Sequence, residues 1–304
     1  MVRDSIERVL ASPVITSWSR RRLRGRQLVL AYHGIIPDGE RGGAGERSLY
    51  VAQRTFAAQL DVLGDVATVV PLTRIDDEGV DTRRGRPRVA ITFDDAYSGA
   101  VTCAVDELES RGMPATVFVA PGCLDRHVFW WDALAHPTGE MTVAVRDHAL
   151  NACHGTDDSV RRWAAATGLT LHTDLPAFAK SATVEELLAA SRRPGIALGS
   201  HTWSHMNLAR ASTDALKTEL QRAHAWLLER APAAYVPHLA YPYGLESTAA
   251  RTAAEECGYA SAFCIAGGWH RAAEAVRFAR PRLNVGAGMS LNGFRARLLG
   301  SRPT

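Results

Sequence analysis

Residues 89–95 of this 304-residue chain read VAITFDD, an apolar run that ends in two carboxylates. A short run with almost no polar alternation is typical of a parallel strand that is buried on both faces. Asp94 and Asp95 therefore leave this strand at its carboxyl end. Adjacent carboxylates at a strand end point in different directions, so one can coordinate a cation while the other accepts a proton from water. The alternative is that the pair caps a helix beginning near Tyr97.

A second polar motif follows another predicted strand farther along the chain. Residues 199–205 read GSHTWSH, so His201 and His205 are four positions apart. On a helical turn, two imidazoles at this spacing lie roughly 5–6 Å apart and face the same way. With a carboxylate from a distant strand end they would form an open metal tripod that leaves room for a water molecule. The alternative is a coincidental pair on a surface or in the core.

The ligand types predict which cation such a tripod would take. Imidazole plus carboxylate with one open position is the set that catalytic zinc favours. We therefore predict zinc, and cobalt, nickel or manganese stay open because ligand type alone does not separate them.

Apolar runs of strand length alternate with helical stretches along most of the chain. Repeated strand–helix units imply parallel strands with right-handed crossovers. About seven such units without a GxGxxG motif favour a distorted (β/α) barrel of the α/β class, whose chemistry sits at the carboxyl ends of the strands. The predicted strands are 26–32, 66–70, 89–93, 115–119, 195–199, 236–241, 259–265 and 282–285. We expect one domain over residues 27–299, with an insertion around 137–182 where helical signals mix with polar turns.

The N-terminal residues and the amino-acid composition predict the cellular compartment and the binding partners of the protein. The formal charge of +3 is too small to argue for nucleic acid, and much of it comes from arginines between positions 20 and 26. Residues 1–26 are expected to be a basic extension, either a solvated tail or a peripheral contact with an anionic membrane face. Five scattered cysteines without CxxC spacing indicate free thiols. No secretory signal or membrane span is recognisable, which predicts a cytoplasmic protein, peripheral at the inner membrane face if the extension binds lipid.

Four short motifs together resemble a known family. Residues 92–95 (TFDD), 200–205 (SHTWSH) and 240–244 (AYPYG) are similar, in order and spacing, to the first three motifs of the NodB-type polysaccharide deacetylases, carbohydrate esterase family 4. Residues 31–35 (AYHGI) resemble the first strand of the branch whose domain opens with a Tyr-His pair. The resemblance covers roughly residues 27–299. It implies a distorted barrel and removal of an N-acetyl group from an amino sugar.

Roles carried over from this resemblance fall on particular positions. It implies that Asp94 is the general base and that Asp95, His201 and His205 bind the metal. The loop containing Pro242 and Tyr243 would line the acyl pocket, and the Tyr243 backbone N–H would help to stabilise the oxyanion.

The chain departs from the family pattern in two places. The third motif often has an arginine two residues before its proline, and that position is Ala240 here; we consider Arg282 as a substitute that orients Asp94. The late Leu-x-His motif, the usual source of the general acid, is not recognisable. His33 is our first candidate for the acid, against the alternative that it only braces a loop. Trp130, Trp131 and Trp269 are candidates for a sugar platform or for ordinary core residues, and His238 and His270 are expected to be structural.

The sequence therefore predicts a metal-dependent carbohydrate N-deacetylase. Its expected substrate is an N-acetylated saccharide in a glycan or glycan precursor, lipid-linked or nucleotide-linked rather than finished wall polymer. A deformylase or other non-peptide amide hydrolase on the same scaffold is one alternative. A catalytically silent carbohydrate-binding relative is another, although an intact Asp94 argues against it.

Overall fold

The computed structural model describes residues 23–41, 45–77, 86–265 and 267–300. One large sheet runs through it in the order β10-β1-β5-β6-β7-β8-β9, and β4 pairs with β5 beside this path. Every pairing in the sheet is parallel. Its strands are β1 (Gln27–Tyr32), β4 (Thr68–Val69), β5 (Arg88–Phe93), β6 (Ala115–Val119), β7 (Ile196–Ser200), β8 (Tyr235–Ala240), β9 (Ser261–Phe263) and β10 (Leu283–Asn284).

The predicted fold class is confirmed. Seven parallel strands follow one another along a curled half-barrel, and β4 is the eighth strand, paired with β5 beside this path. Strands β1, β5 and β6 are buried at every position, as expected of strands covered on both faces. A bridge between Phe263 and Arg280 brings the β9 side of the sheet toward the chain that enters β10. A second, two-stranded sheet joins β2 (Gly34–Ile36) to β3 (Tyr50–Ala52).

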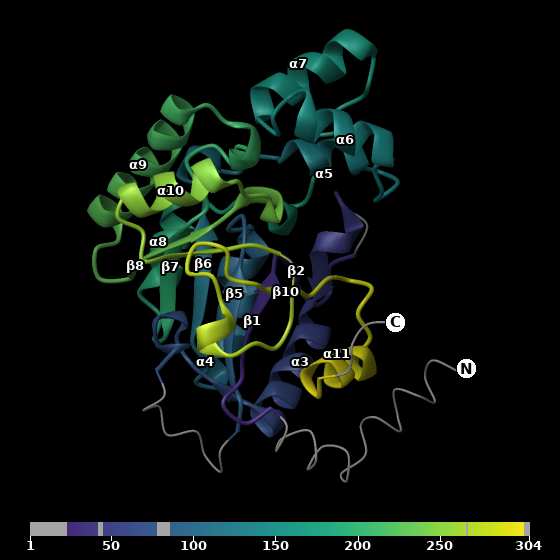
Figure 1. The fold of residues 1–304 in the computed structure, drawn as a ribbon. Helices are drawn as coiled ribbons and strands as arrows, with labels where there is room; N and C mark the ends of the chain where they lie inside the picture. Colours follow the sequence, from purple (N-terminus) through teal and green to yellow (C-terminus); the bar gives the residue numbers. More distant parts are fainter. Residues whose placement is uncertain (1–22, 42–44, 78–85, 266, 301–304) are drawn as a thin grey trace.

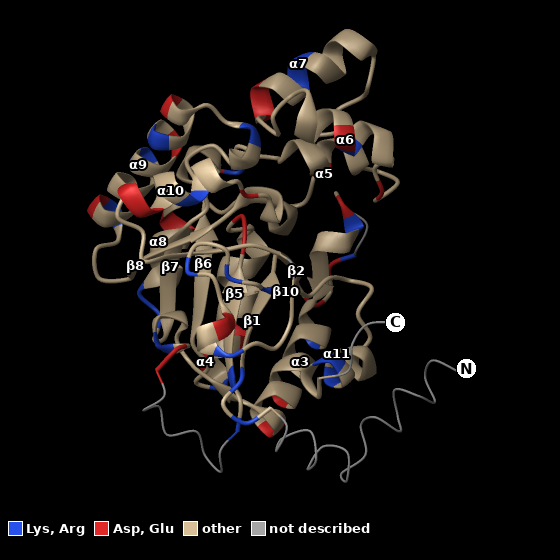
Figure 2. Ribbon diagram, in the orientation of Figure 1, with Lys and Arg blue, Asp and Glu red and all other residues tan. Residues whose placement is uncertain are grey.

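Helices cover the outside of the curled sheet (Figure 1). Several begin with hydroxyl caps: the Thr183 side chain forms a capping box with Glu186, and Ser212 caps the longest helix. The α-helices are α3 (Gln53–Val66), α4 (Val105–Ser110), α5 (Trp130–Ala135), α6 (Val143–Asn151), α7 (Asp157–Thr167), α8 (Val184–Ser191), α9 (Thr213–Arg230), α10 (Thr248–Glu256) and α11 (Leu291–Leu298). Figure 2 shows acidic and basic residues interspersed over these outer helices.

The segment predicted as an insertion, 137–182, contains α6 and α7 and lies with α5 at one end of the sheet (Figure 1). Its boundaries as a separate unit stay a prediction. The predicted basic extension lies almost wholly outside the described residues, because the structure describes nothing before Leu23. All five cysteines are free thiols, as predicted. In the described part of the chain, no helix has the length and hydropathy that crossing a bilayer requires.

A close backbone approach joins the two segments that leave β1 and β5. After Asp95 the chain enters a helix whose first residues include Gly99 and whose next turn is a π-helix, Ala100–Ala104. A Cβ on Gly99 would lie 2.0 Å from the Ile35 carbonyl oxygen in β2. Gly99 therefore lets this helix pack directly on the segment that follows His33.

We predict that Gly99→Ala destabilises the fold by about 1–3 kcal/mol or more, because a backbone carbonyl cannot move aside as a side chain can. Urea unfolding measures the loss. Gly288→Ala is the matched control, since no atom lies within 4 Å of a Cβ at that position. Equal unfolding midpoints for the two variants would show that the helix and β2 can separate without cost.

Candidate functional site

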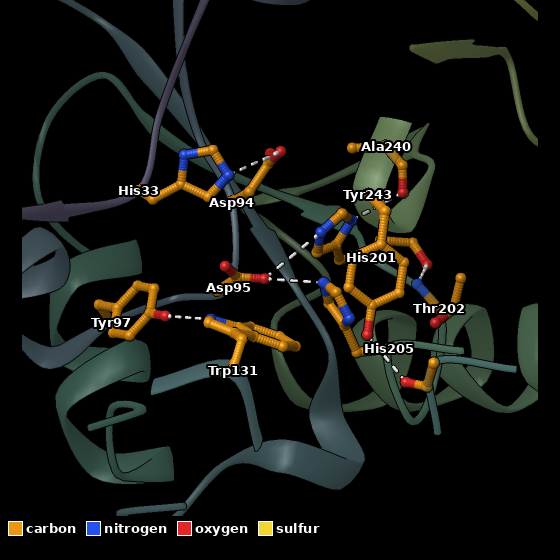
Figure 3. Close-up of polar contacts among 12 residues, drawn as sticks. His33, Asp94, Asp95, Tyr97, Trp131, His201, Thr202, His205, Ala240 and Tyr243 are labelled. Atoms are coloured by element: carbon orange, nitrogen blue, oxygen red, sulfur yellow. Dashed lines mark hydrogen bonds and ion pairs between the residues drawn. The ribbon is translucent and has the colours of Figure 1, made fainter. Parts of the chain in front are cut away.

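Strand register brings the first two predicted site residues together. Strands β1 and β5 pair in parallel, with Tyr32 opposite Phe93, so the residues that follow them leave the sheet side by side. His33 and Asp94 accordingly face each other, with 3.9 Å between His33 Nε2 and Asp94 Oδ2 (Figure 3). Both side chains are buried, with 10% and 2% exposure.

Arg282 holds Asp94 from the opposite side. Its Nη1 and Nη2 each donate to one carboxylate oxygen at 2.7 Å, a bidentate pair in which the guanidinium is fully buried. Nη1 also donates to Thr92 Oγ1, and Nε donates to the Cys264 carbonyl. The prediction that Arg282 orients Asp94 agrees with this geometry, and the guanidinium arrives from the segment entering β10 rather than from the third motif.

The charges around Asp94 keep it ionised. Burial alone would raise the pKa of its carboxyl, but the charge and hydrogen bonds of Arg282, with contributions from His201 and His33 when they are protonated, outweigh burial and lower it. A carboxylate that stays ionised and has its orientation fixed is suited to accept a proton.

Asp95, His201 and His205 converge beside this pair, as predicted. Asp95 Oδ1 lies 3.4 Å from His201 Nε2 and 3.0 Å from His205 Nε2 (Figure 3). The ligand atoms of all three lie within 4.8 Å of one another, and all three residues are buried. Ligands 2.0–2.2 Å from a tetrahedral zinc ion are about 3.3–3.5 Å apart, so the spacing suits such an ion.

The protonation of the group also fits a cation. His201 Nδ1 lies 2.7 Å from the Ala240 carbonyl oxygen, so it carries the ring proton and leaves the Nε2 lone pair facing Asp95. Asp95 Oδ1 is buried and accepts no hydrogen bond from the described residues. Burial raises the pKa of Asp95, but the adjacent His205 and His201 side chains outweigh burial and lower that pKa. A carboxylate and two imidazole nitrogens that converge in this way form a donor set for a divalent metal.

The helical turn predicted for the two histidines is wrong. Residues 201–207 form an irregular loop, in which Thr202 and His205 have positive φ values of 66° and 57°. The left-handed residues turn the chain back, so the two imidazole centroids still come within 4.7 Å. The alternative that the aspartates cap the next helix also does not describe the structure, since Asp94 accepts from Arg282 and Asp95 faces the imidazoles.

Glu219 of α9 supports this strained loop, and the sequence analysis missed it. Its Oε2 accepts the backbone N–H groups of Trp203 and Ser204 at 3.0 and 2.8 Å, and its Oε1 accepts the Ser204 hydroxyl at 2.8 Å. The side chain is nearly buried. No motif in the sequence marks Glu219, because its role depends on the loop that tertiary packing places against it.

A pocket of about 150 Å³ opens above these groups. Its lining comes from strand ends, from the segment before β3 and from α6 of the predicted insertion. Tyr243, at φ 60°, packs edge-on against His205 with centroids 4.6 Å apart, and its hydroxyl donates to the Gly155 carbonyl. The lining residues are His33, Glu46, Leu49, Asp94, Asp95, Trp130, Trp131, Met141, Arg146, Leu150, His201, His205, Tyr243, Ile265 and Asn284.

Some predicted site residues lie elsewhere. Pro242 starts the short turn that positions Tyr243 but does not line the pocket. Trp269 is also outside the lining and donates to the Arg297 carbonyl. His238 and His270 hydrogen-bond to Ser261 and to the Gly268 carbonyl, away from the pocket. Glu46 and Arg146 also line the pocket, and no sequence motif predicts them, because only the fold brings their segments there.

Fold and site together are those expected of a polysaccharide deacetylase domain. The family model for polysaccharide deacetylases matches residues 81–262. The chain belongs to the polysaccharide deacetylase family.

Solved structures with the same fold include two deacetylases and the protein IcaB. The Streptococcus pyogenes deacetylase PplD in complex with acetate has a TM-score of 0.60 at 16% identity, covering 90% of this chain and 98% of the other. IcaB from Ammonifex degensii has a TM-score of 0.61 at 18% identity, covering 90% and 97%. A polysaccharide deacetylase from Bacillus cereus has a TM-score of 0.62 at 16% identity, covering 90% and 69%. At these identities the likeness shows the fold alone, and no curated protein matches the sequence.

We predict that Arg282→Met lowers the free energy of unfolding by about 3–5 kcal/mol, because it leaves the Asp94 charge buried and unpaired. Urea denaturation measures the loss. The double variant Asp94→Asn/Arg282→Met should regain part of this stability without regaining activity. Arg74→Met, which breaks an ion pair whose side chains are 57% and 42% exposed, is the control and should cost about 1 kcal/mol or less. Equal losses for Arg282→Met and the control would contradict a buried, coupled pair.

We also predict that Glu219→Ala weakens Co²⁺ binding by roughly 10–100-fold, the usual effect of removing a group that positions metal ligands. Isothermal titration of the metal-free protein measures the affinity. Glu219→Gln should retain most of it, because its carbonyl still accepts the backbone N–H groups and its amide can donate to Ser204 Oγ. Glu229→Ala, on the exposed face of α9, is the control. Unchanged affinity in Glu219→Ala would show that the loop keeps its shape without this support.

Proposed function

We propose that the protein is a metal-dependent hydrolase that removes the N-acetyl group from an amino sugar in a glycan precursor. Membership of the polysaccharide deacetylase family supports glycan deacetylation. The observation that carries the finer proposal is the placement of an ionised, arginine-held Asp94 beside the converging Asp95, His201 and His205. A base next to a cation site is the arrangement that hydrolysis of an unactivated amide needs.

Asp95, His201 and His205 are the proposed ligands of a divalent ion, with zinc favoured and cobalt, nickel or manganese as alternatives. Such an ion would polarise the acetyl carbonyl and make an attacking water more acidic. Asp94 is the proposed general base, because Arg282 fixes both of its oxygens and its pKa is held low. The Tyr243 backbone N–H is the proposed donor to the developing oxyanion.

His33 is the proposed general acid. Burial lowers the pKa of its imidazole, and Arg282 and His201 lower it further against the opposing effect of Asp94 and Asp95. His33 is therefore neutral in the resting protein near pH 7 and has to gain its proton during the reaction. His33 Nε2 lies 3.9 Å from Asp94 Oδ2, so the proton that Asp94 has accepted would pass to His33 through one water or after a closer approach, and His33 would then protonate the departing amine.

The pocket rim supports a substrate that bears an anionic group. Arg146 projects from α6 as an exposed residue that lines the pocket, and guanidinium groups bind phosphates in a bidentate manner. Lipid-linked and nucleotide-linked saccharides both have a diphosphate beside the sugar. We therefore propose such a precursor as the substrate, processed in the cytoplasm, where free thiols persist. The basic residues 20–26 would then attach the protein to the inner membrane face.

We predict acetate release when the protein, reconstituted with Zn²⁺ or Co²⁺, is incubated with N-acetylglucosamine oligomers or with diphosphate-linked N-acetylated saccharides. Enzymatic acetate assay and mass spectrometry for loss of one acetyl group follow the reaction. Asp94→Asn should lower kcat by roughly 10²–10⁴-fold, because the base is lost. No acetate from either substrate class, with the metal shown to be bound, would reject the proposal, and loss of formyl groups alone would favour a deformylase.

A second prediction concerns His33. His33→Ala should slow amide hydrolysis by roughly 10²–10⁴-fold, yet leave hydrolysis of 4-nitrophenyl acetate little changed, because that leaving group needs no proton. Asp94→Asn should impair both reactions. His224→Ala, whose ring lies on α9 and hydrogen-bonds to Tyr235, is the control. Equal loss on amide and ester would contradict the role of general acid.

A further inference from the structure

A buried carboxylate lies behind the pocket wall and takes no part in the proposed chemistry. Asp132, in the first turn of α5, is fully buried and does not line the pocket. Its Oδ2 accepts the Tyr97 hydroxyl at 2.6 Å, and its Oδ1 accepts the Glu46 backbone N–H at 2.8 Å. The hydroxyl oxygen of Tyr97 in turn accepts the Trp131 indole N–H at 2.9 Å (Figure 3).

These contacts form a chain of hydrogen bonds with a fixed direction. The Trp131 indole can only donate, so the Tyr97 oxygen must accept from it. The single hydroxyl proton of Tyr97 then needs an acceptor of its own, which Asp132 supplies. Burial raises the pKa of the Asp132 carboxyl to about 7, although the hydrogen bonds from Tyr97 and Glu46 oppose this effect. Keeping the Asp132 carboxylate ionised at this buried position therefore costs free energy.

The chain ends on two parts of the pocket lining. One is the Trp131 ring, whose centroid lies 4.7 Å from that of His205 and 5.8 Å from that of Tyr243. This indole also stacks on Phe129, with centroids 4.6 Å apart and planes 9° from parallel. The second part is Glu46, which lines the pocket and whose backbone Asp132 holds. Asp132 thus links two walls that belong to segments far apart in the sequence.

We propose that Asp132, acting through Tyr97, is a positioning residue that sets which acyl groups the pocket admits. It fixes the Trp131 indole against His205 and Tyr243 and fixes the Glu46 segment beside it, so that the space next to the candidate metal ligands suits a small acyl group. This inference rests on the proposed function, because it assigns the acyl selectivity of that same site.

Replacing Asp132 with asparagine tests the chain. Asparagine keeps one acceptor oxygen, so either the Tyr97 hydroxyl or the Glu46 backbone N–H loses its acceptor and meets an amide donor instead. Either orientation loosens one of the two pocket walls that Asp132 links. One extra methylene is worth about 10–200-fold in a tight apolar pocket, so a loosened wall should admit longer acyl groups.

The experiment compares kcat/KM for N-formyl, N-acetyl and N-propionyl glucosamine oligomers in the metal-loaded, full-length protein. We expect Asp132→Asn to raise the propionyl-to-acetyl ratio about 10-fold. Tyr97→Phe should move the ratio in the same direction, because it removes the hydroxyl that links Trp131 to Asp132, and it serves if Asp132→Asn does not fold. Asp147→Asn, an exposed acid on α6, is the control and should leave the ratio unchanged.

A second pair of substrates separates the failure of this proposal from the failure of the proposed function. The same ratio is measured with 4-nitrophenyl propionate and acetate, which do not require recognition of a sugar. A wild-type protein inactive on all sugars would count against the proposed function, and the ester ratio would still report on the pocket. An equal fall for every acyl length in Asp132→Asn and Tyr97→Phe would overturn the selectivity role, as would an unchanged ratio in both.

Discussion

The buried pair between Arg282 and Asp94 is the interaction on which the site depends. Two charges taken out of water are tolerated only where their geometry is good and their remaining hydrogen-bonding groups are satisfied. Here Nη1 and Nη2 of Arg282 each donate to one carboxylate oxygen of Asp94. Nη1 also donates to Thr92 Oγ1, and Nε donates to the Cys264 carbonyl. The pair joins the segment entering β10 to the end of β5, across the intervening strand β1. It also leaves Asp94 ionised and aimed at the pocket.

Around this pair, strand register and hydrogen bonds fix the orientation of the other groups in the site. Parallel register places the residues after β1 and β5 side by side, which brings His33 to Asp94. The Ala240 carbonyl takes the Nδ1 proton of His201, so its other nitrogen faces Asp95. Glu219 holds the loop between the two histidines. Each support comes from a different element, and each acts on a group whose orientation decides its chemistry.

The segment between β6 and β7 contributes a large part of the pocket wall. Trp130 and Trp131 come from α5 and Arg146 from α6. Tyr243, which follows β8, is tied to the same segment because its hydroxyl donates to the Gly155 carbonyl and accepts the Trp130 indole N–H at 3.0 Å. The strand ends thus supply the reactive groups. The segment between β6 and β7 supplies the pocket wall around them and the Arg146 guanidinium at the rim.

The amino-acid sequence by itself determined the strand–helix alternation, the barrel class and the placement of Asp94, Asp95, His201 and His205 after strands. These follow from local periodicity and from the rule that parallel strands end at one edge. It also pointed to Arg282 as the partner of Asp94. The loop geometry of the histidines and the roles of Glu219 and Asp132 were decided only by tertiary structure. Left-handed φ values, a carboxylate that receives backbone N–H groups from another element and a hydrogen-bond chain between distant segments leave no periodic trace in the sequence.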